Sequence, residues 1–374
     1  MKCLARSLVI GIFITTSAAI AAAQVPPEIA AQLRQIGTGV CVPETAKIYA
    51  PLQQHEPYKG VTVVRNISYA SDPRTIMDVF APESGGGNRP VLIYVSGGAG
   101  DKKVNGADGD AFYDNIMLWA VKNGMTGVNM QRRGGGGLAW DETAKDVGLV
   151  VDWVRTNIKM YKGNPNRIFL WSDSAGNGPV STYAAHPEIQ GAGGASVKGV
   201  VLMSPPNFNI SPETAPAGGR GGTPDTSGRG ALSTNCGRPA GAAGGGGAPG
   251  GAARGGAAPA AGRGGAAAPG GPGAAAAPAG RGQAAPVDAA AQMARSNLPG
   301  LAKGKIAVFL GWGEIDSANI WVFDQALKDA LCKAGKCPTS EVFKDHSHVS
   351  LVFSVNSKDD SVTGPILKWM KSVK

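Results

Sequence analysis

One serine stands where an apolar, strand-like segment is expected to turn into a helix. Ser174 lies in Ser172-Asp-Ser-Ala-Gly176, directly after the buried run that ends at Trp171. A serine at the apex of such a turn needs small neighbours, and the usual spelling is Gly-x-Ser-x-Gly. The segment departs from that spelling only at Ser172. An ordinary strand-to-helix loop is the alternative, but the flanking elements favour Ser174 as a nucleophile, ahead of Ser172.

A serine hydroxyl becomes a strong nucleophile only when a base removes its proton, and the chain contains four histidines. His55 precedes the expected sheet. His186 follows Ser174 on the same expected helix, about 18 Å away at 1.5 Å per residue, which is too far. His346 and His348 remain, just after the last expected strand, and both stay candidates on these grounds.

The protonated imidazole of such a base needs a carboxylate to orient and stabilise it. Asp316 and Glu314 both follow the strand-like run that ends at Leu310. Asp316 is the first choice and Glu314 the alternative. An N-cap of the following helix is a competing role for Asp316.

Acyl transfer on a serine also needs N–H donors for the oxyanion that develops in the reaction. The N–H of Ala175 directly follows Ser174. Gly97, Gly98 and Ala99 follow the strand expected at 90–95, and glycines let the backbone approach a ligand closely. A flexible turn is the alternative interpretation of these three residues. We predict that all four contribute to an oxyanion hole.

The elements that must position these residues alternate along the chain. Apolar or alternating runs predict strands at 66–69, 75–80, 90–95, 126–130, 166–171, 198–203, 305–310 and 341–344, and helices at 27–35, 111–123, 141–160, 176–185, 320–334 and 365–373. Such alternation is typical of a mostly parallel central sheet with helices on both faces. In these sheets the ligand site lies beyond the carboxyl ends of the strands, where the candidate residues are expected.

The beginning of the chain is typical of an export signal over residues 1–23. Lys2 and Arg6 precede an apolar run, and Ala21-Ala-Ala23 offers a cleavage point. The apolar run is shorter than the roughly 20 residues that span a bilayer. We therefore expect a secreted or periplasmic protein without stable membrane insertion after cleavage. A lead-in over 24–60 then precedes one domain at 61–374.

Residues 214–286 interrupt that domain with a segment made almost entirely of Gly, Ala, Pro and Arg. It has little apolar surface to bury and is expected to be disordered. Its six arginines and one acid, Asp225, account for +5 of the formal net charge of +9. The segment contains Arg-Gly-Gly triplets, but it has no aromatic residue on which a base could stack. No nucleic-acid partner is expected.

Four cysteines would remain after cleavage at residue 23. An even number in an exported chain permits disulfides. Cys332 and Cys337 are the first expected pair, which leaves Cys41 for Cys236. No His/Cys cluster has the spacing of a zinc site, and neither a metal nor a cofactor is implied.

Together these segments resemble the α/β-hydrolase superfamily, and within it the esterase/lipase group with hormone-sensitive-lipase-like and feruloyl-esterase-like enzymes. Met77-Asp-Val-Phe-Ala-Pro82 is similar to an early strand of the group, and Ser96-Gly-Gly-Ala-Gly100 stands where the group has His-Gly-Gly-Gly. Asp173-Ser-Ala-Gly176 matches its nucleophile turn. The late acid and base match at Gly313–Asp316 and His346–His348. The resemblance covers most of 60–210 and 300–374.

The resemblance implies an α/β-hydrolase fold and a hydrolase that cleaves small-molecule carboxylic esters through an acyl-enzyme on Ser174. With the chain order serine, acid, histidine, it also guides the choice of His348 over His346. A serine peptidase with the same triad is one alternative. A catalytically impaired binding protein is another, because Ser96 and Ser172 replace signature residues. The 214–286 segment takes the place of the superfamily's cap, so the pocket is expected to be open or loosely covered.

Overall fold

The computed structural model describes residues 24–104, 109–134, 138–191, 193–205, 236, 290 and 294–374. The expected signal at 1–23 lies outside these residues. So does the expected insert at 214–286 apart from Cys236, and the expectations for both stay predictions. Within the described ranges, no helix combines the length and the apolar character needed to cross a membrane.

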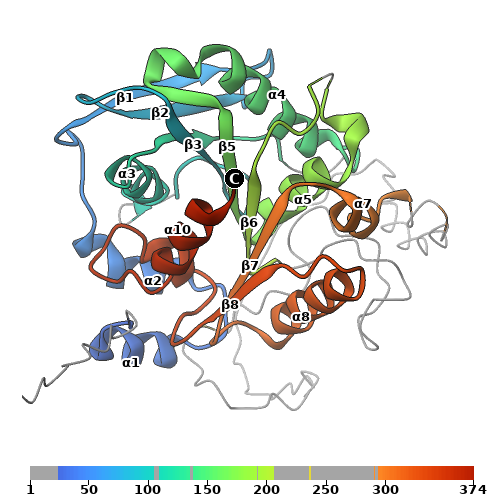
Figure 1. The fold of residues 1–374 in the computed structure, drawn as a ribbon. Coiled ribbons are helices and arrows are strands. Elements are labelled where there is room, and N and C mark those ends of the chain that lie inside the picture. Colours follow the sequence, from blue (N-terminus) through green and yellow to red (C-terminus); the bar gives the residue numbers. More distant parts are fainter. Residues whose placement is uncertain are drawn as a thin grey trace, which may run out of the picture.

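Eight strands form a single sheet in the order β1-β2-β4-β3-β5-β6-β7-β8 (Figure 1). Their bounds are β1 Val61–Ser68, β2 Ile76–Pro82, β3 Arg89–Val95, β4 Thr126–Met130, β5 Gly163–Asp173, β6 Gly199–Met203, β7 Ala307–Gly313 and β8 Thr339–Phe343. The pairs β1–β2 and β2–β4 are antiparallel, and every later pair is parallel. The expected mostly parallel sheet is confirmed.

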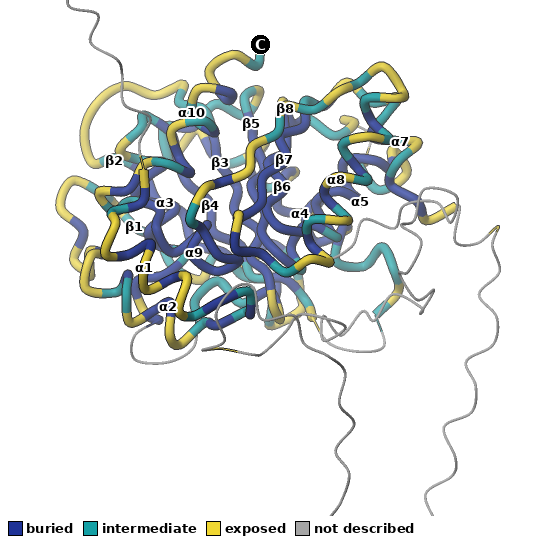
Figure 2. Tube along the Cα trace, turned by 90° about the horizontal axis from the view of Figure 1, so that it is seen from below, coloured by how far each residue is buried: buried dark blue, intermediate teal, exposed yellow. Residues whose placement is uncertain are grey.

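Helices cover both faces of the sheet (Figure 1). One face carries α1 Pro27–Ile36, α2 Val42–Tyr49, α3 Asp114–Lys122, α9 Ser350–Phe353 and α10 Thr363–Ser372, and the other carries α4 Glu142–Asn157, α5 Asn177–Ala185, α7 Leu298–Lys303 and α8 Ala318–Lys333. Successive strand side chains point to opposite faces, so Leu92 and Tyr94 join one core and Val91 and Ile93 the other. This explains the continuous apolar runs of the sequence. Figure 2 shows the buried residues concentrated along these central strands.

The amphipathic helix expected at 141–160 is α4, which continues into the 3₁₀ turn η3 Ile158–Tyr161. Its expected apolar face is buried against the sheet through Val147, Val150, Val151, Val154 and Ile158. The sequence pattern did not predict α2, α7 and α9. They span eight, six and four residues, and periodicity is hard to read over so few positions.

The lead-in at 24–60 packs against the domain expected to begin at residue 61. Ile29, Leu33 and Tyr49 belong to the same core as the first face of the sheet. The side-chain amide of Gln53 donates to the carbonyl oxygens of Phe353 and Val355 at 2.8 and 3.0 Å. The lead-in and the C-terminal part of the chain therefore share one core.

Both expected cysteine pairs form disulfides. Cys332 and Cys337 join the end of α8 to the segment before β8. Cys41 and Cys236 join the residue before α2 to the single described residue of the 214–286 segment.

Candidate active site

Ser174 lies on a sharp turn between β5 and α5, in the one-turn 3₁₀ helix η4 Ser174–Gly176. Its φ is +48°, a conformation that is uncommon for a residue with a side chain and that often marks a functional turn. A Cβ at Gly176 would lie 2.2 Å from the carbonyl oxygen of Val95. The turn therefore needs glycine at 176, as the sequence pattern predicted.

Ser172, which replaces the usual first glycine, is fully buried and hydrogen-bonded. Its hydroxyl donates to Oδ1 of Asn177 at 2.8 Å. The amide of Asn177 in turn donates to the carbonyl oxygens of Ser174 at 2.8 Å and Met203 at 2.7 Å. Asn177 was not predicted from the sequence, where its place just after the serine turn was the only available signal. A serine at 172 thus fits the turn without an unsatisfied hydroxyl.

Asp316 and His348 are brought together at the carboxyl edge of the sheet. Nδ1 of His348 donates to Oδ1 of Asp316 at 2.8 Å. Because a carboxylate only accepts hydrogen bonds, this contact assigns the proton to Nδ1 and leaves Nε2 as the basic nitrogen. Both side chains are buried. The second oxygen of Asp316 accepts from the N–H of Gly313 at 2.9 Å and from the hydroxyl of Ser204.

The alternative base, His346, and the alternative acid, Glu314, have other hydrogen-bond partners. Nδ1 of His346 is hydrogen-bonded to Ser350 at 3.0 Å, and its Nε2 to Ser361 at 2.8 Å. Glu314 accepts from the N–H of Asp345 at 2.9 Å and is exposed. Neither forms a hydrogen bond with the other or with the Asp316–His348 pair. His186 is likewise engaged elsewhere, with Glu188 and Asn297.

The electrostatics of His348 suit a base. Burial by itself would lower its pKa, but the charge and hydrogen bond of Asp316, with a smaller contribution from Asp173, raise the pKa above its ordinary value. Among the described residues, Nε2 of His348 has no hydrogen-bond partner. It forms no hydrogen bond with the Ser174 hydroxyl, and such catalytic hydrogen bonds are often long before substrate binds.

The loop of residues 96–100, here called the glycine loop, packs directly against the serine turn. A Cβ at Gly97 would lie 2.8 Å from Cβ of Ser174. The N–H of Gly97 donates to Oδ1 of Asp173 at 3.0 Å, and the hydroxyl of Tyr94 donates to the same oxygen at 2.5 Å. The Gly97 N–H is therefore engaged within the protein. Gly98 and Ala99, whose N–H groups make no hydrogen bond to the described residues, are the available donors of this loop.

Asp173 is itself buried beside the proposed nucleophile. Burial raises the pKa of its carboxyl group, and the hydrogen bond from Tyr94, the charge of His348 and the N–H of Gly97 act in the opposite direction. The Asp173 carboxyl group and the His348 imidazole are therefore close enough for their charges to influence each other's pKa.

Ser204 is a further site residue that the sequence analysis missed. It follows β6 directly, is almost fully buried, and has a φ of +46°. Its position at the carboxyl end of a strand was the signal that could have found it, since ligand sites lie at that edge.

A mostly parallel sheet, a serine on a strand-to-helix turn and a late aspartate–histidine pair together define the α/β-hydrolase fold. A model of the BD-FAE family matches residues 77–188, which include β2 to α5 and Ser174. The resemblance to the esterase/lipase group of the α/β-hydrolase superfamily is thereby confirmed.

Several curated proteins match part of the chain. Para-nitrobenzyl esterase of Bacillus subtilis is 29% identical over 141 residues, which are 34% of this chain and 28% of that protein. Human cocaine esterase is 29% identical over 154 residues, 37% of this chain and 27% of that protein. The chain thus spans less than a third of the length of these relatives.

Solved structures match over more of the chain and show the fold alone. A thermostable esterase from Pseudomonas putida superposes with a TM-score of 0.53 and 14% identity, over 88% of each chain. Esterase B from Lactobacillus rhamnosis has a TM-score of 0.55 and 14% identity, over 92% of this chain and 94% of that one.

Proposed function

We propose that this protein hydrolyses carboxylic esters through an acyl-enzyme on Ser174. The observation that carries the proposal is the 2.8 Å hydrogen bond between His348 and Asp316. This pair and the strained turn of Ser174 both follow parallel strands at the carboxyl edge of the sheet. The matches to proteins named as esterases support the same chemistry.

Each of these groups has a role in the proposed reaction. Nε2 of His348 takes the proton of the Ser174 hydroxyl as its oxygen attacks the acyl carbonyl, and Asp316 stabilises the imidazolium. The N–H groups of Ala175, Gly98 and Ala99 bind the oxyanion. When the tetrahedral intermediate collapses, the alcohol leaves with the proton from His348. Water then attacks the acyl-enzyme by the same route and releases the acid.

The hydrogen bonds of Ser96 and Ser172 speak against a catalytically impaired binding protein. The hydroxyl of Ser96 donates to the carbonyl oxygen of Asp101 at 2.6 Å and so closes the glycine loop. Ser172 is held by Asn177 at 2.8 Å. Both serines therefore have roles that support the turn or the loop, and neither disrupts the site.

We also propose that the protein is exported and acts on small-molecule esters. The basic and apolar start of the sequence and its alanine-rich cleavage point support export. The two disulfides fit an oxidising compartment. Cell fractionation with an antibody against the folded domain tests this: export predicts the protein outside the cytoplasm, shortened at its N-terminus.

Labelling with a fluorophosphonate probe tests the proposed nucleophile. The wild-type protein should be labelled, Ser174→Ala should not, and the matched control Ser172→Ala should still be labelled. Labelling of Ser174→Ala at the wild-type rate, or none of the folded wild type, would overturn the proposal. Hydrolysis of p-nitrophenyl butyrate, compared with that of peptide p-nitroanilides, should show the ester preference.

A further inference from the structure

Arg132 is a buried cation beside the site that forms no direct ion pair with a described carboxylate, although the charges of Asp173, Asp146 and Asp101 act on it. It follows β4 by two residues and is 6% exposed. Among the described residues it forms no ion pair, and its Nε has no hydrogen-bond partner. Burying an unpaired charge costs free energy. Hydrogen bonds from its guanidinium group to backbone carbonyl oxygens offset part of this cost.

These hydrogen bonds are mainly with the glycine loop. Nη2 of Arg132 donates to the carbonyl oxygen of Gly98 at 3.1 Å and to that of Ser96 at 3.4 Å. Its backbone N–H donates to the carbonyl oxygen of Gly100 at 3.0 Å. A Cβ at Gly100, where φ is +82°, would lie 2.4 Å from Cγ of Arg132. The loop and the arginine are therefore fitted against each other.

These contacts set the direction of the loop's N–H groups. In a trans peptide the C=O of one residue and the N–H of the next point in opposite directions. With the Gly98 oxygen held toward Arg132, the N–H of Ala99 points away from the arginine. A hydrogen bond to the carbonyl oxygen also polarises the same peptide and strengthens its N–H as a donor.

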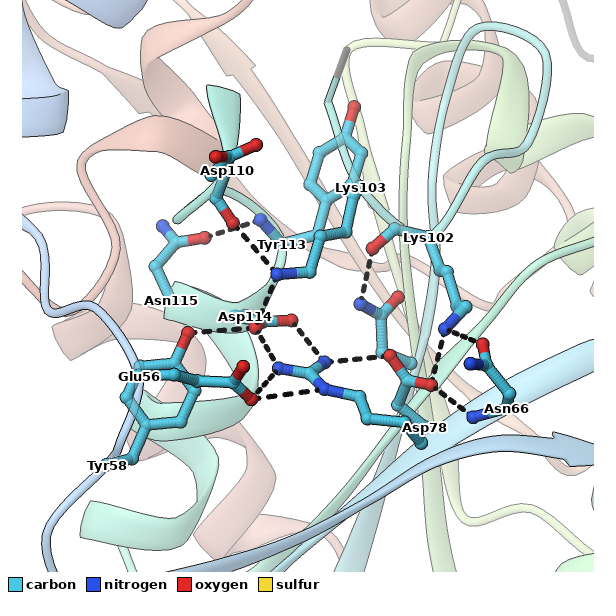
Figure 3. Close-up of polar contacts among 12 residues, drawn as sticks. Glu56, Tyr58, Asn66, Asp78, Lys102, Lys103, Asp110, Tyr113, Asp114 and Asn115 are labelled. Atoms are coloured by element: carbon cyan, nitrogen blue, oxygen red, sulfur yellow. Dashed lines mark hydrogen bonds and ion pairs between the residues drawn. The ribbon is translucent and has the colours of Figure 1, made fainter. Parts of the chain in front are cut away.

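The segment that follows the glycine loop is held by ion pairs of Lys102 and Lys103 (Figure 3). Nζ of Lys102 contacts Oδ1 of Asp78 at 2.5 Å and Oδ1 of Asn66 at 2.7 Å. Nζ of Lys103 contacts Asp114 at 3.1 Å. These anchors act after residue 101. Arg74 is half-exposed, and its only hydrogen bond to the glycine loop is to the carbonyl oxygen of Ala99 at 3.3 Å. It does not hold the Gly98 carbonyl oxygen that Arg132 contacts.

We propose that Arg132 is a positioning residue for oxyanion binding: through the Gly98–Ala99 peptide, it aims the Ala99 N–H at the substrate oxygen. This inference rests on the proposed ester hydrolysis at Ser174. Arg132 does not touch substrate in this proposal. It acts through the Gly98–Ala99 peptide, which contacts the substrate oxygen. Its effect on the oxyanion therefore appears only when the tetrahedral intermediate forms.

The test compares Arg132→Gln and Arg132→Lys with the matched control Arg133→Gln. The neighbouring Arg133 pairs with Glu142 and Asp146, and its side chain forms no hydrogen bond or ion pair with the glycine loop. Two measurements are made: kcat and KM for p-nitrophenyl butyrate, and the affinity for phenylethylboronic acid. The boronic acid forms a tetrahedral adduct with the serine and so reports oxyanion binding without turnover.

Loss of an oriented oxyanion donor lowers kcat more than it changes KM. For Arg132→Gln we expect kcat to fall about 10- to 100-fold and boronate affinity to fall with it, while KM stays within about threefold. Arg132→Lys keeps the charge without the planar fork, so its values should lie in between. Arg133→Gln should keep the wild-type kcat.

A folded Arg132→Gln variant with wild-type kcat and boronate affinity would overturn the inference, even if its melting temperature fell. If Arg132→Gln does not fold, the same two readouts on Arg132→Lys decide. Failure of the proposed function is distinguishable, because the wild-type protein itself would then neither hydrolyse the ester nor label at Ser174.

Discussion

The hydroxyl of Ser204 donates to one oxygen of Asp316 while His348 donates to the other. The carboxylate is thus held from two sides, and the N–H of Gly313 adds a third contact at 2.9 Å. Ser204 makes its contact from a backbone with a φ of +46°, which costs free energy for a residue with a side chain. A strained residue that contacts the acid of the proposed triad is expected to serve the reaction.

Removal of the Ser204 hydroxyl should lower activity. A hydrogen bond to a charged group contributes about 1.5 to 3 kcal/mol, so kcat/KM for p-nitrophenyl butyrate should fall about tenfold or more. Ser204→Ala keeps the backbone strain and Ser204→Gly relieves it. If kcat/KM falls in both variants, the loss is due to the missing hydroxyl. A wild-type kcat/KM in Ser204→Gly would contradict a role of the Ser204 hydroxyl in the reaction.

The raised pKa of His348 predicts the pH dependence of the reaction. The imidazole must be neutral to accept the Ser174 proton, so kcat/KM should rise with pH and reach half its maximum above about 6.5, the ordinary histidine value. In Asp316→Asn the partner that raises the pKa is gone and burial remains. The acid limb should then move to lower pH, and kcat should fall on the order of a thousandfold or more.

The pH profile of Glu314→Gln is the matched control for this change. Glu314 is the other acid of the same loop, but it contacts the N–H of Asp345 and not His348. Its profile should superpose on that of the wild type. An acid limb that moves with Glu314→Gln and stays in place with Asp316→Asn would reverse the two assignments.

The sequence predicted strands whose carboxyl ends the sheet brings to one edge. Ser174, Asp316 and His348 each follow a predicted strand, and a parallel sheet brings the carboxyl ends of its strands to one edge. The positions of the strands do not distinguish His346 from His348. The two residues are close in one turn, and only the placed side chains show which imidazole reaches Asp316.

Contacts between side chains of separate loops could not be predicted. Ser204, Asn177 and Arg132 act through single hydrogen bonds to residues distant in the chain or to backbone carbonyls. No periodicity or motif marks such pairs. The engagement of the Gly97 N–H by Asp173 is of the same kind, since it depends on one rotamer.

The burial of His346 predicts a loss of stability in acid. Burial lowers its pKa from 6.5 to about 4, against the opposing charges of Asp359 and Asp345. Between these two values the unfolded chain binds more protons than the folded one, so stability present above about 6.5 is lost as the pH falls toward 4. Moving from a pH of about 7.5 to about 4.5 should cost about 2 to 3 kcal/mol through this residue alone.

Urea unfolding of wild type and His346→Gln at both pH values isolates this contribution. Protonation of carboxylates also destabilises the folded protein in acid, but this contribution is the same in the wild type and the variant. The wild type should therefore lose more stability than the variant. Equal losses in the two proteins would show that His346 does not titrate in this range.

The hydrogen bonds of Asn177 lead us to expect that this side chain stabilises the turn at Ser174. It accepts from the Ser172 hydroxyl at 2.8 Å and the Met203 N–H at 3.0 Å, and donates to the carbonyl oxygens of Ser174 and Met203. Asn177→Ala leaves the Met203 N–H and the carbonyl oxygens of Ser174 and Met203 without this partner, while the Ser172 hydroxyl keeps the Val201 carbonyl oxygen at 3.3 Å. The free energy of unfolding should fall by about 3 kcal/mol or more. Ser172→Gly restores the usual glycine and removes the hydroxyl that donates to Asn177 and Val201, at a cost of about 1 kcal/mol.

The double variant separates a shared network from two independent contacts. Asn177→Ala already breaks the hydrogen bond to Ser172, so adding Ser172→Gly should cost less than it does alone. Urea unfolding gives the three free-energy changes, and fluorophosphonate labelling reports whether Ser174 keeps its reactivity. Strict additivity, or wild-type labelling in a folded Asn177→Ala protein, would mean that Asn177 does not position the serine turn.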